Sequence, residues 1–129
     1  MLSVIDEILK RDNRYKIHAY SFILASLEVA RQITKKPKHV TALELLEGVK
    51  VLAQKEFGIM AKTVLECCGI KTTDDIGEIV FNLIEADILS KTEEDKKEDF
   101  HNIFNFDEVF IKEYQFSVLP SKDKIIDDK

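Results

Sequence analysis

Apolar residues recur at helical spacing from Leu2 to about Ala86, and this periodicity is the feature that most restricts the fold. Residues three or four positions apart share one face of an α-helix, whereas the apolar residues of a half-buried strand alternate with polar ones. Helix-breaking residues are rare, because the 129 residues include only four glycines and two prolines. The pattern predicts a mainly α protein with a single helical domain of five to seven helices.

The first two helices are expected at Leu2–Arg11 and Ile17–Thr34. Residues 12–14, with the sequence Asp-Asn-Arg, have the composition of a connector between them. The second helix carries a wide apolar stripe. We expect it to stop before Pro37, because the residue that precedes a proline is pushed out of helical geometry.

Capping signals bound the next two helices. Thr41 and Glu44 match a capping box, in which each side chain satisfies a free backbone donor at the start of a helix. Gly58 follows the last apolar residue of this third helix, and Gly69 follows a fourth helix over residues 59–68. Glycine is suited to both positions, because a left-handed backbone has little steric cost for it.

The fifth helix is expected to begin at a cap provided by Thr72 or Thr73 and to end near Ala86. Residues 88–106 fit either a hairpin or a further helix. The order of helix, glycine turn, capped helix and short apolar exit over residues 59–91 is similar to that of a winged-helix unit. A small winged-helix-like hairpin is therefore the alternative for this part of the chain.

The length is that of one domain, which can bury a substantial core. We expect the helical domain to cover residues 1–119 and a charged tail to cover residues 120–129. The content of 45% hydrophobic and 33% charged residues is typical of a folded protein.

We expect a cytoplasmic protein without a membrane segment. The strictly apolar runs are short, such as residues 22–25 and 79–81, whereas a membrane-spanning helix needs about 20 apolar residues. Asp6 and Glu7 stand where a secretory signal would carry basic residues.

The two cysteines, Cys67 and Cys68, are adjacent in the sequence. Disulfide frameworks and zinc sites both need spaced cysteines, so neither is expected. The apolar neighbours of this pair predict two buried, free thiols on a helix.

The net charge of −5 is unevenly distributed. Residues 1–71 hold 12 basic and 8 acidic side chains, whereas residues 72–129 hold 7 basic and 16 acidic ones. The two parts therefore carry charges of +4 and −9. Such an asymmetry can orient a partner or a second copy, although solvated helix faces often carry charge without a binding role.

A set of short motifs between His39 and Phe110 carries a resemblance to a known family, with residues 77–85 as the most distinctive run. The motifs are His39-Val40-Thr41, Glu44-Leu45-Leu46-Glu47-Gly48, Phe57-Gly58 with Ala61, Val64-Leu65, Gly69-Ile70, Thr73, Gly77-Glu78-Ile79-Val80-Phe81-Asn82-Leu83-Ile84-Glu85, Lys91-Thr92 with Asp95, Asp99-Phe100 and Phe106. They cover a little over half of the chain and resemble an uncharacterised family of short bacterial proteins. That family has no assigned activity, so the resemblance implies kinship without a mechanism.

The sequence contains no phosphate-binding glycine loop, nucleophile elbow or paired-histidine zinc helix. Its densest polar cluster is acidic, and metals such as Ca²⁺ or Zn²⁺ accept carboxylate and imidazole ligands. Lys96 and Lys97 lie within the cluster and would compete for its carboxylates, which favours an ordinary solvated surface. We therefore expect no catalytic, cofactor-binding or metal-binding residue, and an enzyme is the less favoured class. The cluster consists of Glu94, Asp95, Glu98, Asp99 and His101.

Other chemical candidates are weaker. Glu78 and Glu85 are two turns apart on about one helix face, so they could form a carboxylate pair. A polar helix face accounts for both residues and is the favoured interpretation. His18 and His39 are isolated in the sequence, and no nucleophile accompanies either of them.

The favoured function is protein–protein interaction, as an adaptor, an accessory subunit or a self-associating module. The last third of the chain carries more large apolar side chains than a small core needs. Packing of the same side chains inside the core is the competing interpretation. The residues expected to contact a partner are Phe100, Phe104, Phe106, Phe110, Tyr114 and Phe116.

Two other functions stay open. A winged-helix-like nucleic-acid-binding protein would use two basic clusters of the N-terminal half, provided that they meet on one surface. Nucleic acid is not the expected partner, because the chain from Thr72 to Leu89 has five acidic and no basic residues and would be repelled by phosphates. A small enzyme or metal protein would show a deep pocket with convergent carboxylates or a histidine. The basic clusters are Lys10, Arg11, Arg14 and Lys16, and Arg31, Lys35, Lys36 and Lys38.

Overall fold

The computed structural model describes residues 2–35, 40–89 and 97–113 of the chain. The elements in this part are all helical, which confirms the prediction of a mainly α single domain. The α-helices are α1 (Leu2–Arg11), α2 (Ile17–Thr34), α3 (Ala42–Phe57), α4 (Ala61–Cys67) and α5 (Thr73–Glu85). Three short helices complete the set: the 3-10 helices η1 (Gly58–Met60) and η2 (Lys97–Phe100), and the π-helix η3 (Asp107–Glu113).

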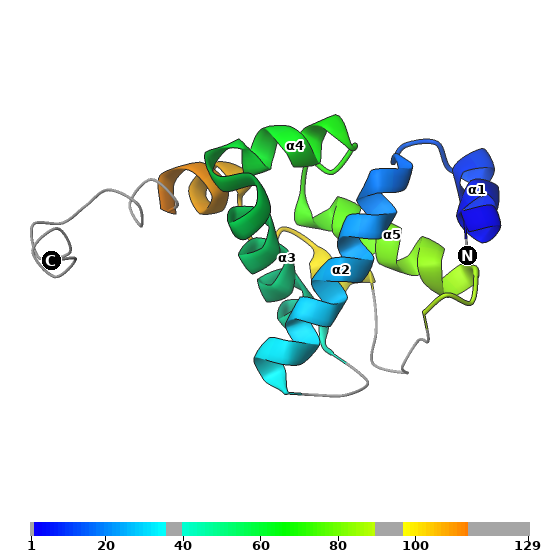
Figure 1. The fold of residues 1–129 in the computed structure, drawn as a ribbon, viewed down its shortest axis with the longest axis horizontal. Helices are drawn as coiled ribbons and strands as arrows, with labels where there is room; N and C mark the ends of the chain where they lie inside the picture. Colours follow the sequence, from blue (N-terminus) through cyan, green and yellow to red (C-terminus); the bar gives the residue numbers. More distant parts are fainter. Residues whose placement is uncertain (1, 36–39, 90–96, 114–129) are drawn as a thin grey trace, which may run out of the picture.

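The centre of the fold is the pair α2 and α3, which make the most extensive contact between any two elements of the described chain (Figure 1). Helix α5 packs against α2, and η2 packs against both α5 and α3. Helix α1 lies beside the N-terminal end of α2, while α4 crosses near the end of α3 (Figure 1). The π-helix η3 contacts α3, η1 and α4.

Local signals in the sequence set the ends of these helices. Thr41 caps α3 as expected: its hydroxyl accepts a hydrogen bond from the amide of Glu44 (3.1 Å), and the Glu44 carboxylate accepts one from the amide of Thr41 (2.8 Å). Thr72 takes the cap position of α5, and Asp75 Oδ2 accepts from its amide (3.2 Å). Thr73, the other candidate cap, is instead the first residue of α5 and is fully buried.

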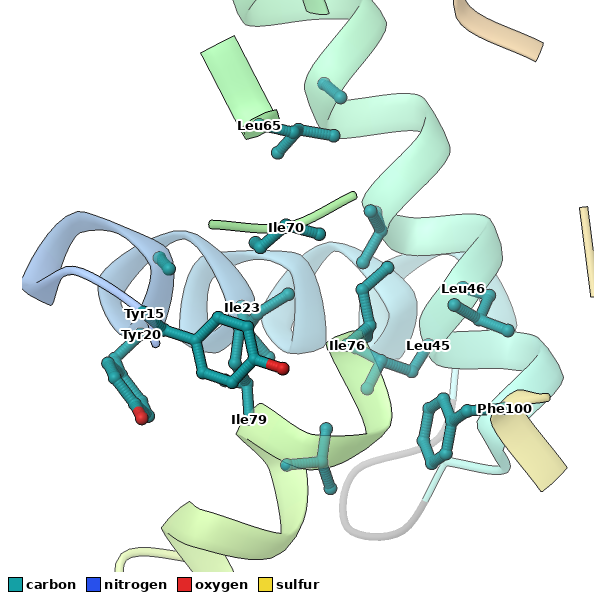
Figure 2. Packing of buried hydrophobic residues seen from close by; sticks show 14 of the residues in the cluster. Tyr15, Tyr20, Ile23, Leu45, Leu46, Leu65, Ile70, Ile76, Ile79 and Phe100 are labelled. Carbon is teal, nitrogen blue, oxygen red and sulfur yellow. The ribbon is translucent and has the colours of Figure 1, made fainter. Parts of the chain in front are cut away.

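The core draws side chains from every α-helix and from the segment after α4. Figure 2 shows side chains of α2, α3 and α5 meeting Leu65 and Ile70 in one cluster, with Phe100 at its edge. Helices α2 and α3 approach closely at Gly48, where an added Cβ would lie 2.5 Å from the carbonyl oxygen of Ser26. The absence of a Cβ at residue 48 therefore allows the two backbones to pack directly together.

Two expectations about the later part of the chain need correction. Residues 58–60 form the separate helix η1, so the fourth α-helix begins at Ala61 and not at Ile59. Its last residue, Cys67, is exposed and only Cys68 is partly buried, so the prediction of two buried thiols is wrong. The exposure arises because α4 packs through Ala61 and Leu65, which turns residue 67 toward solvent.

No strand occurs among residues 88–89 and 97–106, where a hairpin was the alternative to a helix. Residues 97–100 form η2, and Phe100 packs against Gly77 of α5, where an added Cβ would lie 2.9 Å from the ring. The expected charged tail, residues 120–129, lies outside the described residues.

Candidate functional site

An apolar pocket of about 360 Å³ opens between α2, the end of α3, and α4. The elements bring together side chains that are far apart in the sequence. The lining residues are His18, Ala19, Phe22, Phe57, Val64, Leu65, Cys68 and Ile70.

Helical spacing explains how these residues come to face one another. On α4, Val64 and Cys68 are four residues apart and therefore share one face, next to the face that buries Leu65 in the core. On α2, His18 and Phe22 have the same spacing. The pocket lies between these two rows of side chains.

An aromatic pair forms one wall of the pocket. The rings of Phe22 and Phe57 lie 5.6 Å apart between centroids and are tilted by 32°. Such offset pairs add to the stability that burial alone supplies, by about 0.5–1.5 kcal/mol. Both rings are only partly buried, so they remain available to a further apolar group.

The lining has two side chains that are not hydrocarbons, His18 and Cys68. His18 is exposed at the edge, and Cys68 is partly buried. Burial raises the pKa of the Cys68 thiol, repulsion from Cys67 raises it further, and attraction by Lys16 partly opposes both. These effects favour the neutral thiol, which behaves as a small apolar group.

Two exposed apolar side chains come shortly after Phe57, one of the lining residues, in the sequence. Ile59 and Met60 lie between Phe57 and α4, and they are 47% and 53% exposed. Met60 is one turn before Val64, so it extends the row formed by Val64 and Cys68. The apolar surface of this region thus reaches beyond the lining itself.

The aromatic residues expected to contact a partner lie mainly inside the protein. Phe100, Phe106 and Phe110 are buried, and Phe104 is partly buried against the core. Phe104, Phe106 and Phe110 form a three-ring cluster with centroids 5.1–6.0 Å apart. These positions agree with the competing interpretation, in which the same side chains pack inside the core. Tyr114 and Phe116 lie outside the described residues.

A second, more polar pocket of about 290 Å³ lies at the start of α5. Asp74 Oδ2 is 2.8 Å from His101 Nδ1, and Asp74 Oδ1 accepts a hydrogen bond from the amide of Asn102 (2.9 Å). The bond from the Asn102 amide is the main cause that lowers the pKa of Asp74, and His101 lowers it further. These contacts fasten the chain after η2 to α5.

The acidic candidates are engaged by basic side chains. Glu78 Oε1 accepts from Arg14 (3.1 Å) and from Lys97 (3.3 Å), while Glu85 pairs with Arg11 (3.6 Å). Within residues 2–35, 40–89 and 97–113, no three His, Cys, Asp or Glu side chains gather into a group that could hold a metal ion. Glu94 and Asp95 of the predicted acidic cluster lie outside these ranges, as does His39.

Among the described residues, the two basic clusters lie toward opposite ends of α2. Lys16 precedes the first turn of α2 and Arg31 lies in its last turn, so about 22 Å of helix separates them. Arg14 is also occupied, because it bonds Asp12 and Glu78, and Arg31 pairs with Glu28. The separation of these basic side chains and their ion pairs do not favour a nucleic-acid-binding surface. Lys36 and Lys38 are not among the described residues.

The sequence identified His18 and Cys68 only as an isolated histidine and a structural thiol. It did not predict the pocket, because its lining comes from separate elements whose packing is not encoded in any short motif. The one local signal is the row of residues 60, 64 and 68, which extends the apolar face of α4 beyond what the core uses.

No helix in the described part of the chain is long and apolar enough to span a membrane. No protein-family model, curated protein or solved structure matches this chain. The similarity to an uncharacterised bacterial family therefore stays a prediction from the sequence.

Proposed function

We propose that this protein is a protein–protein interaction module that holds an apolar side chain of its partner in the pocket between α2, α3 and α4. The observation that carries the proposal is the open pocket of about 360 Å³, whose walls are almost entirely apolar. Ligand pockets in proteins commonly span about 300–1,000 Å³. This pocket is at the low end of that range, where one or two large side chains suffice to fill it.

The composition of the surrounding surface supports the same function. Phenylalanine and methionine are enriched in interface centres, and an unbranched methionine adapts to different partner shapes. Phe22 and Phe57 supply the wall, and Met60 supplies an exposed apolar side chain beside it. A partner side chain seated here would be the buried anchor of a larger contact.

Site-specific photo-cross-linking in the protein's native cells tests the proposal. A diazirine-bearing side chain at Val64 would face the pocket, whereas the same group at Thr63 would sit on the exposed side of α4. We expect a discrete protein adduct from position 64 and little or none from position 63. Mass spectrometry of the adduct would identify the partner, and an adduct with a second copy would mean self-association.

A pocket-filling variant supplies the matched control. Val64→Phe should occupy the pocket and abolish the adduct from a cross-linker placed at Met60, whereas Thr63→Phe should leave it. Thermal unfolding of both variants would verify that they fold, because overpacking costs about 1–3 kcal/mol. Equal adducts in the two variants, or no adduct at position 64 in the original chain, would contradict the proposal.

A further inference from the structure

We infer that the partner segment carries a carboxylate next to its apolar anchor, and that Lys16 selects it. This inference rests on the proposed function and names the chemistry of the partner at the same pocket. The occupant is a peptide segment with one or two large apolar side chains and an adjacent Asp or Glu. The charges at the edge of the pocket favour this occupant.

Lys16 is held beside the Cys68 end of the pocket by the backbone. Its amide donates a hydrogen bond to the carbonyl oxygen of Cys68 (3.1 Å), and its side chain is exposed. The positive charge of Lys16 also opposes part of the rise in the pKa of the Cys68 thiol. Lys16 is the residue directly before α2, so its backbone position is fixed relative to His18, a lining residue two positions further along the chain.

The charge of Lys16 is not neutralised by the described part of the chain. Neither Lys16 nor His18 has an acidic side chain within 4.0 Å among residues 2–35, 40–89 and 97–113, whereas Arg11, Arg14 and Lys97 all do. The residues that line the pocket include no Asp or Glu. An entering carboxylate would therefore meet a free cation, and an entering ammonium group would be repelled.

A segment of a protein fits this surface better than a small carboxylate does. The pocket is open on one side, and Ile59 and Met60 continue the apolar surface outside it. A small molecule could fill the hollow but would leave those two side chains in water. A peptide can place one side chain in the pocket, cover the neighbouring apolar surface and present its carboxylate to Lys16.

Three fluorescein-labelled peptides with the same Leu and Phe anchors would test this, with Glu, Gln or Lys as the flanking residue. Fluorescence anisotropy should show the tightest binding for the Glu peptide and the weakest for the Lys peptide. Lys16→Glu should lower the affinity for the Glu peptide by about two- to fivefold, which is the range of one exposed ion pair. The same variant should bind the Lys peptide more tightly than the original chain does. Lys35→Glu, an equal charge change at the far end of α2, should leave this order unchanged.

The outcomes separate the two proposals. If all three peptides bind equally, and Val64→Phe abolishes their binding, the pocket takes a protein segment and the role of Lys16 is wrong. Failure of all three peptides to bind would count against the docking function itself. Octanoate and the unlabelled Glu peptide can be compared as competitors of the labelled Glu peptide. If octanoate displaces it at equally low concentrations, the pocket binds small carboxylates and the inference is overturned.

Discussion

The hydroxyl of Tyr15 donates a 2.6 Å hydrogen bond to Oδ1 of Asp75, and this bond joins the chain before α2 to the start of α5. The same carboxylate accepts bonds from the amides of Lys71 and Thr72 through its other oxygen. Burial and the bond to Asp75 both raise the pKa of Tyr15. One carboxylate thus joins the chain at Tyr15 to the segment that leads into α5.

Tyr15→Phe should lower the free energy of unfolding by about 1.5–3 kcal/mol, because the lost bond has a charged acceptor. Tyr20→Phe is the matched variant, since the Tyr20 hydroxyl accepts from the neutral amide of Asn82 (3.1 Å). It should cost only about 0.5–1.5 kcal/mol. Urea unfolding of both variants measures the difference, and an equal or larger loss for Tyr20→Phe would refute this ranking.

The stability of the protein should fall in acid partly through Asp12. Hydrogen bonds from Arg14 and Asn82 hold the pKa of Asp12 well below its usual range. The folded state therefore binds this proton less readily than the unfolded state, whose Asp pKa is about 3.9. The contribution of Asp12 to the free energy of unfolding is complete above about pH 5 and is lost progressively as the pH falls below about 4.

Asp12→Asn should lower the free energy of unfolding by about 1 kcal/mol near pH 7. This value is modest because Arg14 is exposed to solvent, which weakens the ion pair. The loss should become smaller toward pH 2. Denaturant unfolding at several pH values would measure it. Asp6→Asn removes an exposed carboxylate and controls for the change in net charge. A cost of Asp12→Asn that stays constant between pH 7 and pH 2 would show that its effect is not electrostatic.

Gly48→Ala should destabilise the protein, although alanine is the better helix former by about 1 kcal/mol. The new methyl group would lie 2.5 Å from the carbonyl oxygen of Ser26 and 3.0 Å from Ala30, so α2 and α3 would have to separate. We expect a net loss of about 1–3 kcal/mol in thermal or urea unfolding. Ser21→Ala, at an exposed site of α2, should be neutral or stabilising. Stabilisation by Gly48→Ala would be inconsistent with the close contact.

Occupation of the pocket should slow the alkylation of Cys68. In Cys67→Ser the remaining thiol lines the pocket, whereas in Cys68→Ser the remaining thiol is exposed outside it. Without a ligand, Cys67 should react with maleimide faster than Cys68, because Cys67 is more exposed. Saturation with the Glu-flanked peptide should reduce the rate only in Cys67→Ser. Equal protection of both thiols would indicate binding away from the pocket.

The helices of the first two thirds of the chain could be predicted because their ends have local causes. The Thr41 and Glu44 capping box and the periodicity of Ile17–Thr34 each act within a few residues. The break at Gly58 was expected, but the 3-10 turn after it was not, because its geometry depends on how α3 and α4 pack. The exposure of Cys67 could not be predicted either, because it also depends on how α4 packs.

The candidate site and the end of the fold depend on contacts between distant residues. Phe100 is buried because it packs on Gly77 and because Thr73 accepts and donates hydrogen bonds around it. Nothing in the local sequence distinguishes such a phenylalanine from one at an interface. The pocket likewise exists only once α2, α3 and α4 have assembled, so its residues could be recognised singly but not as a group.

The close packing of α2 and α3 at Gly48 also has a consequence for the order of folding. The two helices are neighbours in the sequence, so the entropy lost in bringing them together is small. Phe100 and Phe110, in contrast, join the core across long stretches of chain. We therefore expect the helix pair α2 and α3 to form the nucleus of the folding transition state, and residues 97–113 to dock onto it later. Substitutions at the contact of α2 with α3 should then slow folding, whereas substitutions at Phe100 or Phe110 should chiefly accelerate unfolding.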